Sequence, residues 1–457
     1  MMGVPLPIFY LIGLVAFVAI LFVGFKRPMY EVMTFSFLFI ILVSGQFEMF
    51  WSSLLYPSTS SLFYAIFAFM VVAVIFDATR VVERIINLML SVVGRFRGGA
   101  GYVSLLGSTF MASLSGTGPG NVAATGVFTI PTMKKAGYPA KLAATTEMSA
   151  SMLGNIIPPS GIVLLTFGIL EGISPGSISL SQWFVVAYAV GFWFFLQRWL
   201  TLWGMCKYYK VKPIANEDIP KFSKSLKIGW PALVLPALIF IPLFADAQFK
   251  DMIISRIGED GAAAFSSSVL MFTPGLAGAY AIGIGKKAFF SGSETNIGQM
   301  ITTLKGSLQK VVPIGVTIYM AYATSQVFAG MGMEQVVRDW FVSLGMTVPL
   351  MIVILPLFFM ILGMVLPGSA QIAILGGAMI AAFGSLGGDP VLFAVLLPAM
   401  TGALEGMTPP LALGLFVAMG IAGSGFKETS KLALVWILLH VLLSMLLLTG
   451  LLPIVGL

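Results

Sequence analysis

Long apolar stretches separated by few charges limit the folds that are open to this chain. A transmembrane helix needs about 20 consecutive, mostly apolar residues. Such stretches predict membrane spans at residues 4–25, 29–49, 61–78, 142–170, 182–205, 228–246, 263–285, 311–330, 390–424 and 432–450. Charged residues make up 9% of the 457 residues, against about 25% in a soluble domain. The chain is therefore predicted to be an all-α integral membrane protein.

One apolar region is interrupted by the run SLSGTGPGNVAATG, residues 113–126, which is rich in glycine, hydroxyl and amide groups. Basic residues flank the region on both sides, with Arg95 and Arg97 before it and Lys134 and Lys135 after it. The apolar arms of about 14 residues rise only about 1.5 Å per residue, so neither arm crosses a bilayer alone. Residues 99–134 are therefore predicted to form a re-entrant helical hairpin that enters from the cytoplasm.

The distribution of Lys and Arg predicts the topology, because cytoplasmic loops carry an excess of both. With the loop at Lys26 in the cytoplasm, every Lys and Arg falls inside except Lys250, Arg256 and Arg338. The loop predicted at 246–260 lies outside and is acidic. This topology places the N-terminus in the periplasm. It also accounts for the net charge of +7 without nucleic-acid binding.

The second half of the sequence repeats the pattern of the first. Pro409-Pro410 in EGMTPPLALGLF correspond to Pro158-Pro159 in GNIIPPSGIVLL, and Pro367-Gly368-Ser369 correspond to the tip of the first hairpin. Amphipathic stretches (FDATRVVERIINLMLSVVGRFRGG and MGMEQVVRDWFVSLG) precede both tips. We predict a first repeat at 1–206, with a broken span at 142–170, and a cytoplasmic linker at 207–227. The second repeat, 228–457, has a hairpin at 346–384 and a broken span at 390–424. Because each half crosses the bilayer an odd number of times, the second repeat is inverted. This arrangement is typical of secondary transporters.

Unwound backbone survives at membrane depth only where it is buried in protein or lines a cavity. Freed carbonyls, hydroxyls and half-helix ends can then bind small cations and carboxylates. The predicted cation-binding residues are Ser115, Thr117, Asn121, Asn155, Ser369, Thr401 and Thr408, and the predicted substrate-binding residues are Gly116, Gly118, Ser160, Gly368 and Gln371. Two alternatives remain for these residues. The breaks could be simple helix kinks, and the hydroxyls could donate hydrogen bonds only to the backbone of their own helix or to a neighbouring helix.

Two acids, Glu147 and Glu405, are the carboxylates that we place inside the membrane, one near each double proline. Intramembrane acids are costly and indicate function by default. Either acid could accept a proton, coordinate a cation, or cap an unwound segment while protonated. The single cysteine, Cys206, and the single histidine, His440, are too few for a zinc, haem or iron–sulfur site, and His440 is expected to be packed.

The runs SLSGTGPGNVAATGVFTIPTMKKAGY, EMSASMLGNIIPPS and TPPLALGLFVAMGIAG resemble the large membrane subunit (DctM-like) of tripartite ATP-independent periplasmic (TRAP) transporters. The resemblance covers nearly the whole chain. It implies a multi-pass importer of organic acids in the bacterial inner membrane, driven by sodium through an elevator movement of the two hairpins. It also implies two partners, a small four-helix membrane subunit and a periplasmic substrate-binding protein.

The chain departs from the family pattern at several positions. Asn121 stands where many members have an acid, and both Asn121 and Glu147 resemble the TAXI subgroup. Pro367 replaces another common acid, while Thr401 and Glu405 replace an asparagine and a glycine. Proton coupling is therefore an alternative to sodium. A channel is a further alternative. An intramembrane serine protease is not expected, because the sequence has no recognisable nucleophile motif to pair with its single histidine, His440.

Overall fold

The computed structural model describes residues 5–115, 118–289, 297–409 and 412–457, and these residues form helices and no strand. The first part of the chain contains α1 (Leu6–Ala19), α2 (Met29–Ser44), α3 (Phe50–Thr59), α4 (Ser61–Ala78), α5 (Val81–Val93), α6 (Gly99–Ser115), α7 (Gly118–Lys135), α8 (Ala140–Met152), α9 (Gly161–Ile173) and α10 (Leu180–Tyr208). The second part contains α11 (Phe222–Gln248), α12 (Lys250–Phe289), α13 (Ile297–Gly330), α14 (Met333–Ser343), α15 (Val348–Leu362), α16 (Gly368–Gln371), α17 (Gly377–Ser385), α18 (Pro390–Met400), α19 (Gly402–Glu405), α20 (Leu413–Ala422) and α21 (Phe426–Leu448).

The protein is an all-α, multi-pass membrane protein. Within the described residues, 7 helices are long and apolar enough to cross a membrane, or up to 9 if each bent pair counts as one span. Large apolar side chains cover the outer surface, among them Ile241 and Phe272, which are 65% and 75% exposed. Such a surface is stable against lipid and would aggregate in water.

Two of the expected boundaries are wrong. The loop expected at 246–260 is mostly helical, because α11 continues to Gln248 and α12 starts at Lys250. Asp246 therefore lies on α11 and is only 4% exposed, so it is buried within the protein. The hydroxyls of Ser181 and Ser266 donate hydrogen bonds to its carboxylate, which satisfies the acid inside the protein. In addition, α3 lies between the spans predicted at 29–49 and 61–78, where no helix was predicted.

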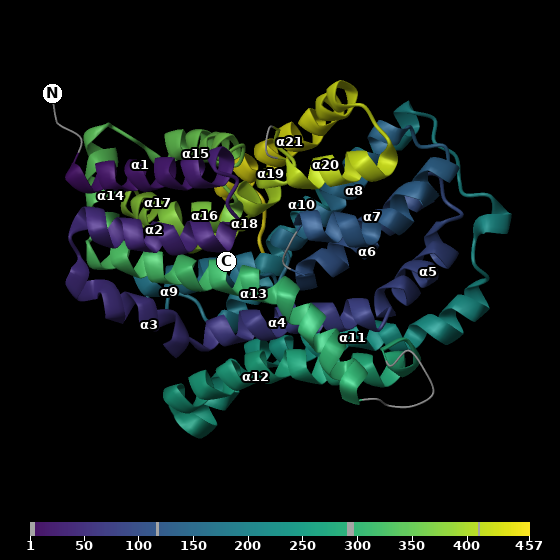
Figure 1. The fold of residues 1–457 in the computed structure, drawn as a ribbon, viewed down its shortest axis with the longest axis horizontal. Helices are drawn as coiled ribbons and strands as arrows, with labels where there is room; N and C mark the ends of the chain where they lie inside the picture. Colours follow the sequence, from purple (N-terminus) through teal and green to yellow (C-terminus); the bar gives the residue numbers. More distant parts are fainter. Residues whose placement is uncertain (1–4, 116–117, 290–296, 410–411) are drawn as a thin grey trace.

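The two amphipathic stretches form α5 and α14, each directly before a helical hairpin. The stretch predicted as the first hairpin contains α6 and α7, which contact each other. The stretch predicted as the second contains α15, α16, a π-helical turn at Ile372–Gly376 and α17; here α15 contacts α18 and α21, and α17 contacts α14 and α18. In Figure 1, α6 and α7 lie toward the right end of the molecule, whereas α14, α15 and α17 lie toward the left end. The short helices α16, α18 and α19 lie between them, so both hairpins point their tips toward the middle.

Each broken span is packed between parts of the other half of the chain. Helix α9 contacts α17, α18 and the π-helical turn, and α20 contacts α7 and α8. Glycines permit close packing at two of these breaks. A Cβ at Gly154 would overlap Ala112 of α6, and a Cβ at Gly368 would overlap the backbone of Gly402. The hairpins and broken spans are thus interlocked, while α2, α3, α4, α11, α12 and α13 pack on one another beside them.

Candidate functional site

A cavity of about 540 Å³ lies where the hairpin tips meet the surrounding helices. Pro119 and Gly120 contribute the first hairpin, and Pro367 and Ser369 contribute the second. We name it the tip cavity; its lining residues are Phe22, Pro28, Met29, Tyr30, Met70, Pro119, Gly120, Gly161, Ile162, Pro313, Ile314, Thr317, Ile318, Pro367, Ser369, Glu405 and Leu413. Residues of α2, α4 and α13 also line the cavity, so it lies between the hairpin tips and these helices.

Ser369 and Glu405 are the predicted site residues that line the tip cavity. The Glu405 carboxylate accepts a hydrogen bond from the backbone N–H of Gly368, at the start of α16. This contact ties the broken span to the second tip, as expected for an acid that caps unwound backbone. Glu405 is nevertheless not fully buried, so its carboxylate can also meet a ligand in the cavity.

Three predicted amide side chains are buried and each leaves one oxygen unpaired. Asn155 donates from Nδ2 to the carbonyl oxygen of Gly402 at 2.5 Å, and Gln371 donates from Nε2 to the carbonyl oxygen of Leu366 at 2.8 Å. The amide oxygens of Asn121, Asn155 and Gln371 have no hydrogen-bond partner among the described residues. Buried oxygens of this kind are costly unless something satisfies them, and a small cation can do so.

The hydroxyl groups of three predicted site residues lie close to backbone carbonyl oxygens. Thr401 donates to the carbonyl oxygen of Leu397, and Thr408 to that of Leu404, both at 2.7 Å. Their hydrogens are thus used within their own helices, although their lone pairs remain available. Ser160 is buried and lies 3.4 Å from the carbonyl oxygen of Asn155.

The first tip is described only in part. Gly116 and Thr117 lie outside the described residues, and so does the side chain of Ser115. Gly118 is buried at the start of α7, where a Cβ would overlap the side chain of Met152.

Glu147 lies away from the tip cavity, between α6, α7 and α8, and is 0% exposed. Five hydroxyls surround its carboxyl group and form what we name the hydroxyl cage. Ser108, Thr125 and Ser151 donate to Oε1 at 2.8, 2.5 and 3.1 Å. Ser104 and Thr129 donate to Oε2 at 2.5 and 2.6 Å.

Asn121 belongs to the hydroxyl cage rather than to the tip cavity. Its Nδ2 donates to the Ser108 carbonyl oxygen at 3.0 Å and to the Ser151 hydroxyl at 2.8 Å. Among the described residues, no Lys, Arg or His forms a hydrogen bond or ion pair with Glu147. The cage therefore holds a buried acid with hydroxyl partners alone.

A cavity of about 320 Å³ reaches the hydroxyl cage from one side. It lies between α5 and the first hairpin, and Arg80, Glu83 and Thr125 are among its lining residues. Thr125 thus lines the cavity and also donates to Glu147. Water in this cavity would lie one hydroxyl away from the buried carboxyl group.

Sequence reasoning missed a second buried polar group around Arg198, which is 1% exposed. Its Nε donates to the carbonyl oxygen of Ser149 at 3.1 Å, and an Nη donates to Nδ1 of His440 at 2.9 Å. His440 Nε2 lies 2.8 Å from the carbonyl oxygen of Ala399. Since Nδ1 accepts from Arg198, the Nε2 of a neutral imidazole carries the hydrogen. His440 is packed, as expected, and joins α10 to α18 and α21.

The chain matches the family described as "Tripartite ATP-independent periplasmic transporter, DctM component" over residues 1–455. It is 25% identical to the 2,3-diketo-L-gulonate TRAP transporter large permease protein YiaN of Escherichia coli, covering 79% of this chain and 78% of YiaN. It is 24% identical to the C4-dicarboxylate TRAP transporter large permease protein DctM of Pseudomonas aeruginosa, covering 79% and 77%. These relatives are transporter permeases, not enzymes.

Two solved structures share the fold at low sequence identity. The Alcanivorax borkumensis YdaH transporter matches with a TM-score of 0.56 and 16% identity, covering 88% of this chain and 90% of the other. Neisseria gonorrhoeae MtrF, described as one of a class of antimetabolite efflux pumps, matches with a TM-score of 0.54 and 13% identity, covering 89% and 85%. At these identities, the likeness concerns the fold alone.

Proposed function

The chain belongs to the DctM family of tripartite ATP-independent periplasmic transporters, and on this premise we propose that it imports a small organic acid driven by a sodium gradient. The named relatives carry C4-dicarboxylates and 2,3-diketo-L-gulonate, which are acids. The tip cavity supports the proposal because half-helix N-termini favour carboxylates. The helices α9 and α20 begin at Gly161 and Leu413, which both line the cavity.

An elevator movement of two inverted repeats is the mechanism that we propose. The order of elements supports it, because a long helix, an amphipathic helix, a hairpin, a broken span and a long helix follow one another in both halves. The hairpins and broken spans form one interlocked body, and the tip cavity lies between this body and α2, α4 and α13. Sliding of that body would carry the cavity across the membrane.

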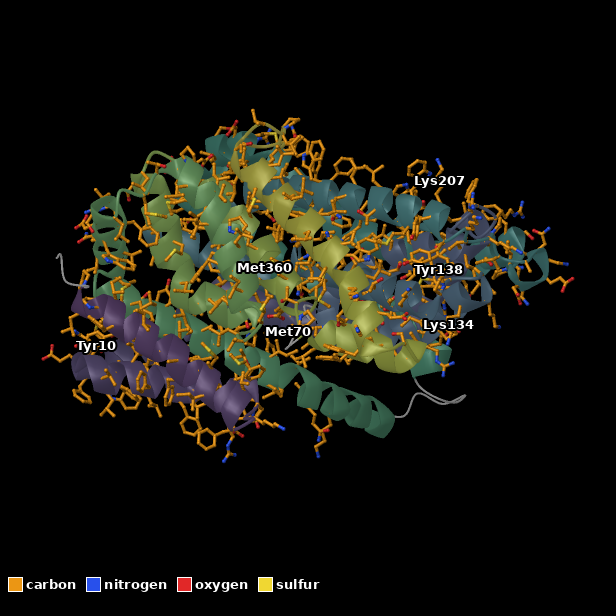
Figure 2. The ribbon with its side chains drawn as sticks, turned by 90° about the horizontal axis from the view of Figure 1, so that it is seen from above. Tyr10, Met70, Lys134, Tyr138, Lys207 and Met360 are labelled. Atoms are coloured by element: carbon orange, nitrogen blue, oxygen red, sulfur yellow. The ribbon has the colours of Figure 1, made fainter. Side chains whose placement is uncertain are left out.

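The proposed orientation places the N-terminus in the periplasm of a bacterium, with the protein in the inner membrane. Figure 2 shows Lys134, Tyr138 and Lys207 at one end of the molecule and Tyr10 at the other. An excess of Lys and Arg marks the cytoplasmic side. The first hairpin would then enter from the cytoplasm and the second from the periplasm.

Unpaired amide oxygens are the observation that carries the sodium proposal. Asn121 Oδ1 and Asn155 Oδ1 are buried and lack partners among the described residues, and Thr401 and Thr408 keep lone pairs that could coordinate a cation. Sodium ions in transporters of this type bind oxygen donors at unwound backbone. We assign Asn121, Asn155, Ser369, Thr401 and Thr408 to cation binding together with Ser115 and Thr117. Gly116, Gly118, Ser160, Gly368 and Gln371 are assigned to the organic acid.

Proton coupling is the second candidate, favoured by the hydroxyl cage. A hydroxyl can donate to a carboxylate or accept from a carboxylic acid, so the cage satisfies Glu147 in both protonation states. A sodium ion would have to displace hydroxyls that already contact the carboxyl oxygens at 2.5 to 3.1 Å. The cavity at Thr125 supplies a route for the proton. Glu405, which faces the tip cavity, is a second proton or cation site in this scheme.

Two partners belong to the proposal because TRAP systems are tripartite: a small membrane subunit, which we expect to have four helices, and a periplasmic substrate-binding protein. The test reconstitutes the permease with both partners in liposomes and measures uptake of radiolabelled acid under separate sodium and proton gradients. Saturable uptake that needs the binding protein and one of the two gradients is expected. Conduction without the binding protein would indicate a channel instead.

A further inference from the structure

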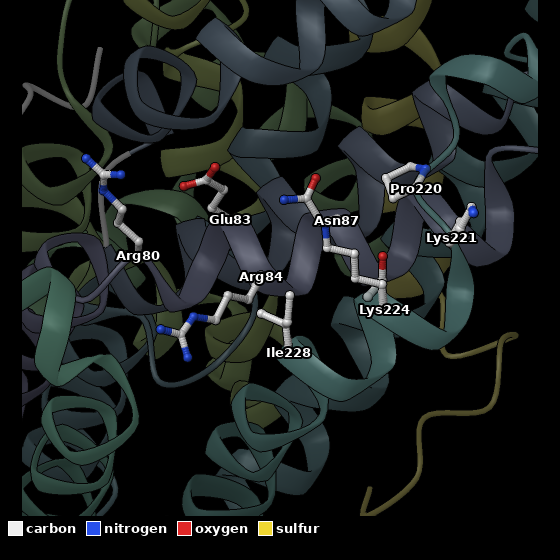
Figure 3. A pocket seen from close by; sticks show the side chains of 9 residues that line it. Arg80, Glu83, Arg84, Asn87, Pro220, Lys221, Lys224 and Ile228 are labelled. Carbon is white, nitrogen blue, oxygen red and sulfur yellow. The ribbon is translucent and has the colours of Figure 1, made fainter.

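A third cavity, of about 750 Å³, opens between α5 and the first turns of α11. Figure 3 shows its lining side chains, which include Arg80, Arg84, Lys221 and Lys224 together with a single acid, Glu83. We name it the basic pocket. The basic pocket shares Arg80 and Glu83 with the cavity beside the hydroxyl cage, but Arg84, Lys221 and Lys224 have no role in the transport proposal.

The cations of the basic pocket are largely free to bind an anion. Arg80, Lys221 and Lys224 are exposed, and none of them forms an ion pair among the described residues. Arg84 donates one hydrogen bond, from Nη1 to the carbonyl oxygen of Ile284 at 3.1 Å, which leaves its other donors available. Four cations against one acid give the pocket an excess positive charge that favours a phosphate group.

The surface beside the pocket indicates its depth in the membrane. From Ile228 onward, α11 exposes apolar side chains, with Ile228 and Trp230 at 49% and 55% exposure. Exposed Trp side chains gather at the level of lipid headgroups. Lys221 and Lys224 precede this apolar face by one to two turns, so the basic pocket lies where headgroups begin and the apolar face of α11 can accept acyl chains.

We propose that the basic pocket binds the phosphate headgroup of an anionic phospholipid, with its acyl chains along the exposed face of α11. A pocket for soluble phosphate would gain nothing from an apolar rim, whereas Ile228 lines this pocket and continues into that face. Basic pockets between membrane helices on the cytoplasmic side bind anionic lipid headgroups in this way. The lipid would bridge α5, which leads into the first hairpin, to α11.

The test uses the full chain purified in detergent and exposed to phosphatidylglycerol, phosphatidylcholine or inorganic phosphate, with bound molecules counted by native mass spectrometry. We expect wild type to retain phosphatidylglycerol in preference to phosphatidylcholine. Each Lys near an anionic headgroup contributes about fivefold in affinity, so Lys221→Gln with Lys224→Gln is expected to weaken binding about 25-fold. Lys427→Gln with Lys431→Gln removes the same charge from exposed positions at the start of α21 and serves as the matched control.

Three outcomes would overturn the proposal. Equal retention of phosphatidylglycerol and phosphatidylcholine by wild type would show that the pocket does not select charge. Undiminished binding in the double Lys221 and Lys224 variant, or equal loss in the control, would place the lipid elsewhere. Competition by millimolar inorganic phosphate with no lipid retained would identify a soluble anion as the ligand. Equal melting temperatures of the three proteins establish that the variants are folded.

Discussion

Asn155, in the first broken span, donates its side-chain N–H to the backbone carbonyl oxygen of Gly402, in the second broken span, at 2.5 Å. The bond joins the two halves of the chain at the depth of the hairpin tips and leaves Asn155 Oδ1 unpaired. One side chain therefore holds the two breaks together and keeps a free oxygen that the proposed sodium ion would contact. This double role makes Asn155 a sharp test of the proposed sodium site.

Replacing Asn155 by Ala removes both the bond and the free oxygen, and leaves the buried Gly402 carbonyl without its partner at a cost of about 1–3 kcal/mol. We expect uptake to need at least tenfold more sodium, measured as the sodium concentration that gives half-maximal rate. Asn155→Asp restores an oxygen and should recover part of the sodium dependence. An unchanged sodium requirement in Asn155→Ala would remove Asn155 from the site.

A substitution at Gly368 tests whether the second tip packs directly against the backbone of Gly402. A Cβ there would overlap backbone atoms of Gly402, which cannot move aside as a flexible side chain can. Gly368→Ala is expected to reduce uptake at least tenfold, while the protein still reaches the membrane. Gly172→Ala, at a helical position with nothing within 4 Å of the added carbon, is the control and should keep wild-type uptake. Wild-type uptake by Gly368→Ala would contradict a closely seated tip.

Glu147 tests proton coupling. Glu147→Gln keeps the shape of the cage but cannot gain or lose a proton, so stimulation of uptake by an inward proton gradient should disappear. Thr125→Val should slow the response by removing the hydroxyl between the cavity and Glu147, and Thr125→Ser should restore it. Glu428→Gln, at an exposed acid paired with Lys141, is the control. If Glu147→Gln and wild type gave the same pH profile, the proton would bind elsewhere, with Glu405 as the next candidate.

The sequence predicted an all-α membrane protein correctly because the signals for spans are local. Apolar length predicts the spans, and the glycine-rich breaks are the basis on which the hairpin tips and broken spans are predicted. The region around Asp246 was predicted wrongly because a charged residue in a sequence window counts as a loop signal. In the structure, Ser181 and Ser266 hydrogen-bond that carboxylate, and neither residue is near it in the chain.

The candidate site was predictable only in part, because its hydrogen-bond partners are also distant from one another in the chain. Glu147 stands out as an isolated acid, but its partners come from three helices. A hydroxyl pattern at helical spacing was available as a signal, since Ser104 and Ser108 lie four residues apart on α6, as do Thr125 and Thr129 on α7. Arg198 was assigned to the cytoplasmic charge excess, because its position near the end of a span gives no sign of a buried partner.

Arg198 gives a prediction about stability. Arg198→Met leaves the Ser149 carbonyl oxygen and His440 Nδ1 without their donor, at about 1–3 kcal/mol for each buried group. We expect a clearly lower melting temperature in detergent. Arg198→Lys should not rescue it, because one ammonium group cannot reproduce the fork that reaches both partners. Arg95→Met, at an exposed position, should melt like wild type, and equal melting of Arg198→Met would show that the group adds no stability.

Topology gives the last prediction, because the inverted arrangement requires the two hairpins to enter from opposite sides. Single cysteines are introduced at Arg95, Lys134 and Arg338 in a Cys206→Ala background, since Cys206 is the only native cysteine and is buried. A membrane-impermeant maleimide should label position 338 in intact spheroplasts, and positions 95 and 134 only after the membrane is opened. A cysteine at Lys212, in the predicted cytoplasmic linker, is the control for opening. Because positions 95 and 134 flank the first hairpin, labelling them on different sides would mean that the segment crosses the bilayer completely, and the tip cavity could not be formed by two opposed hairpins.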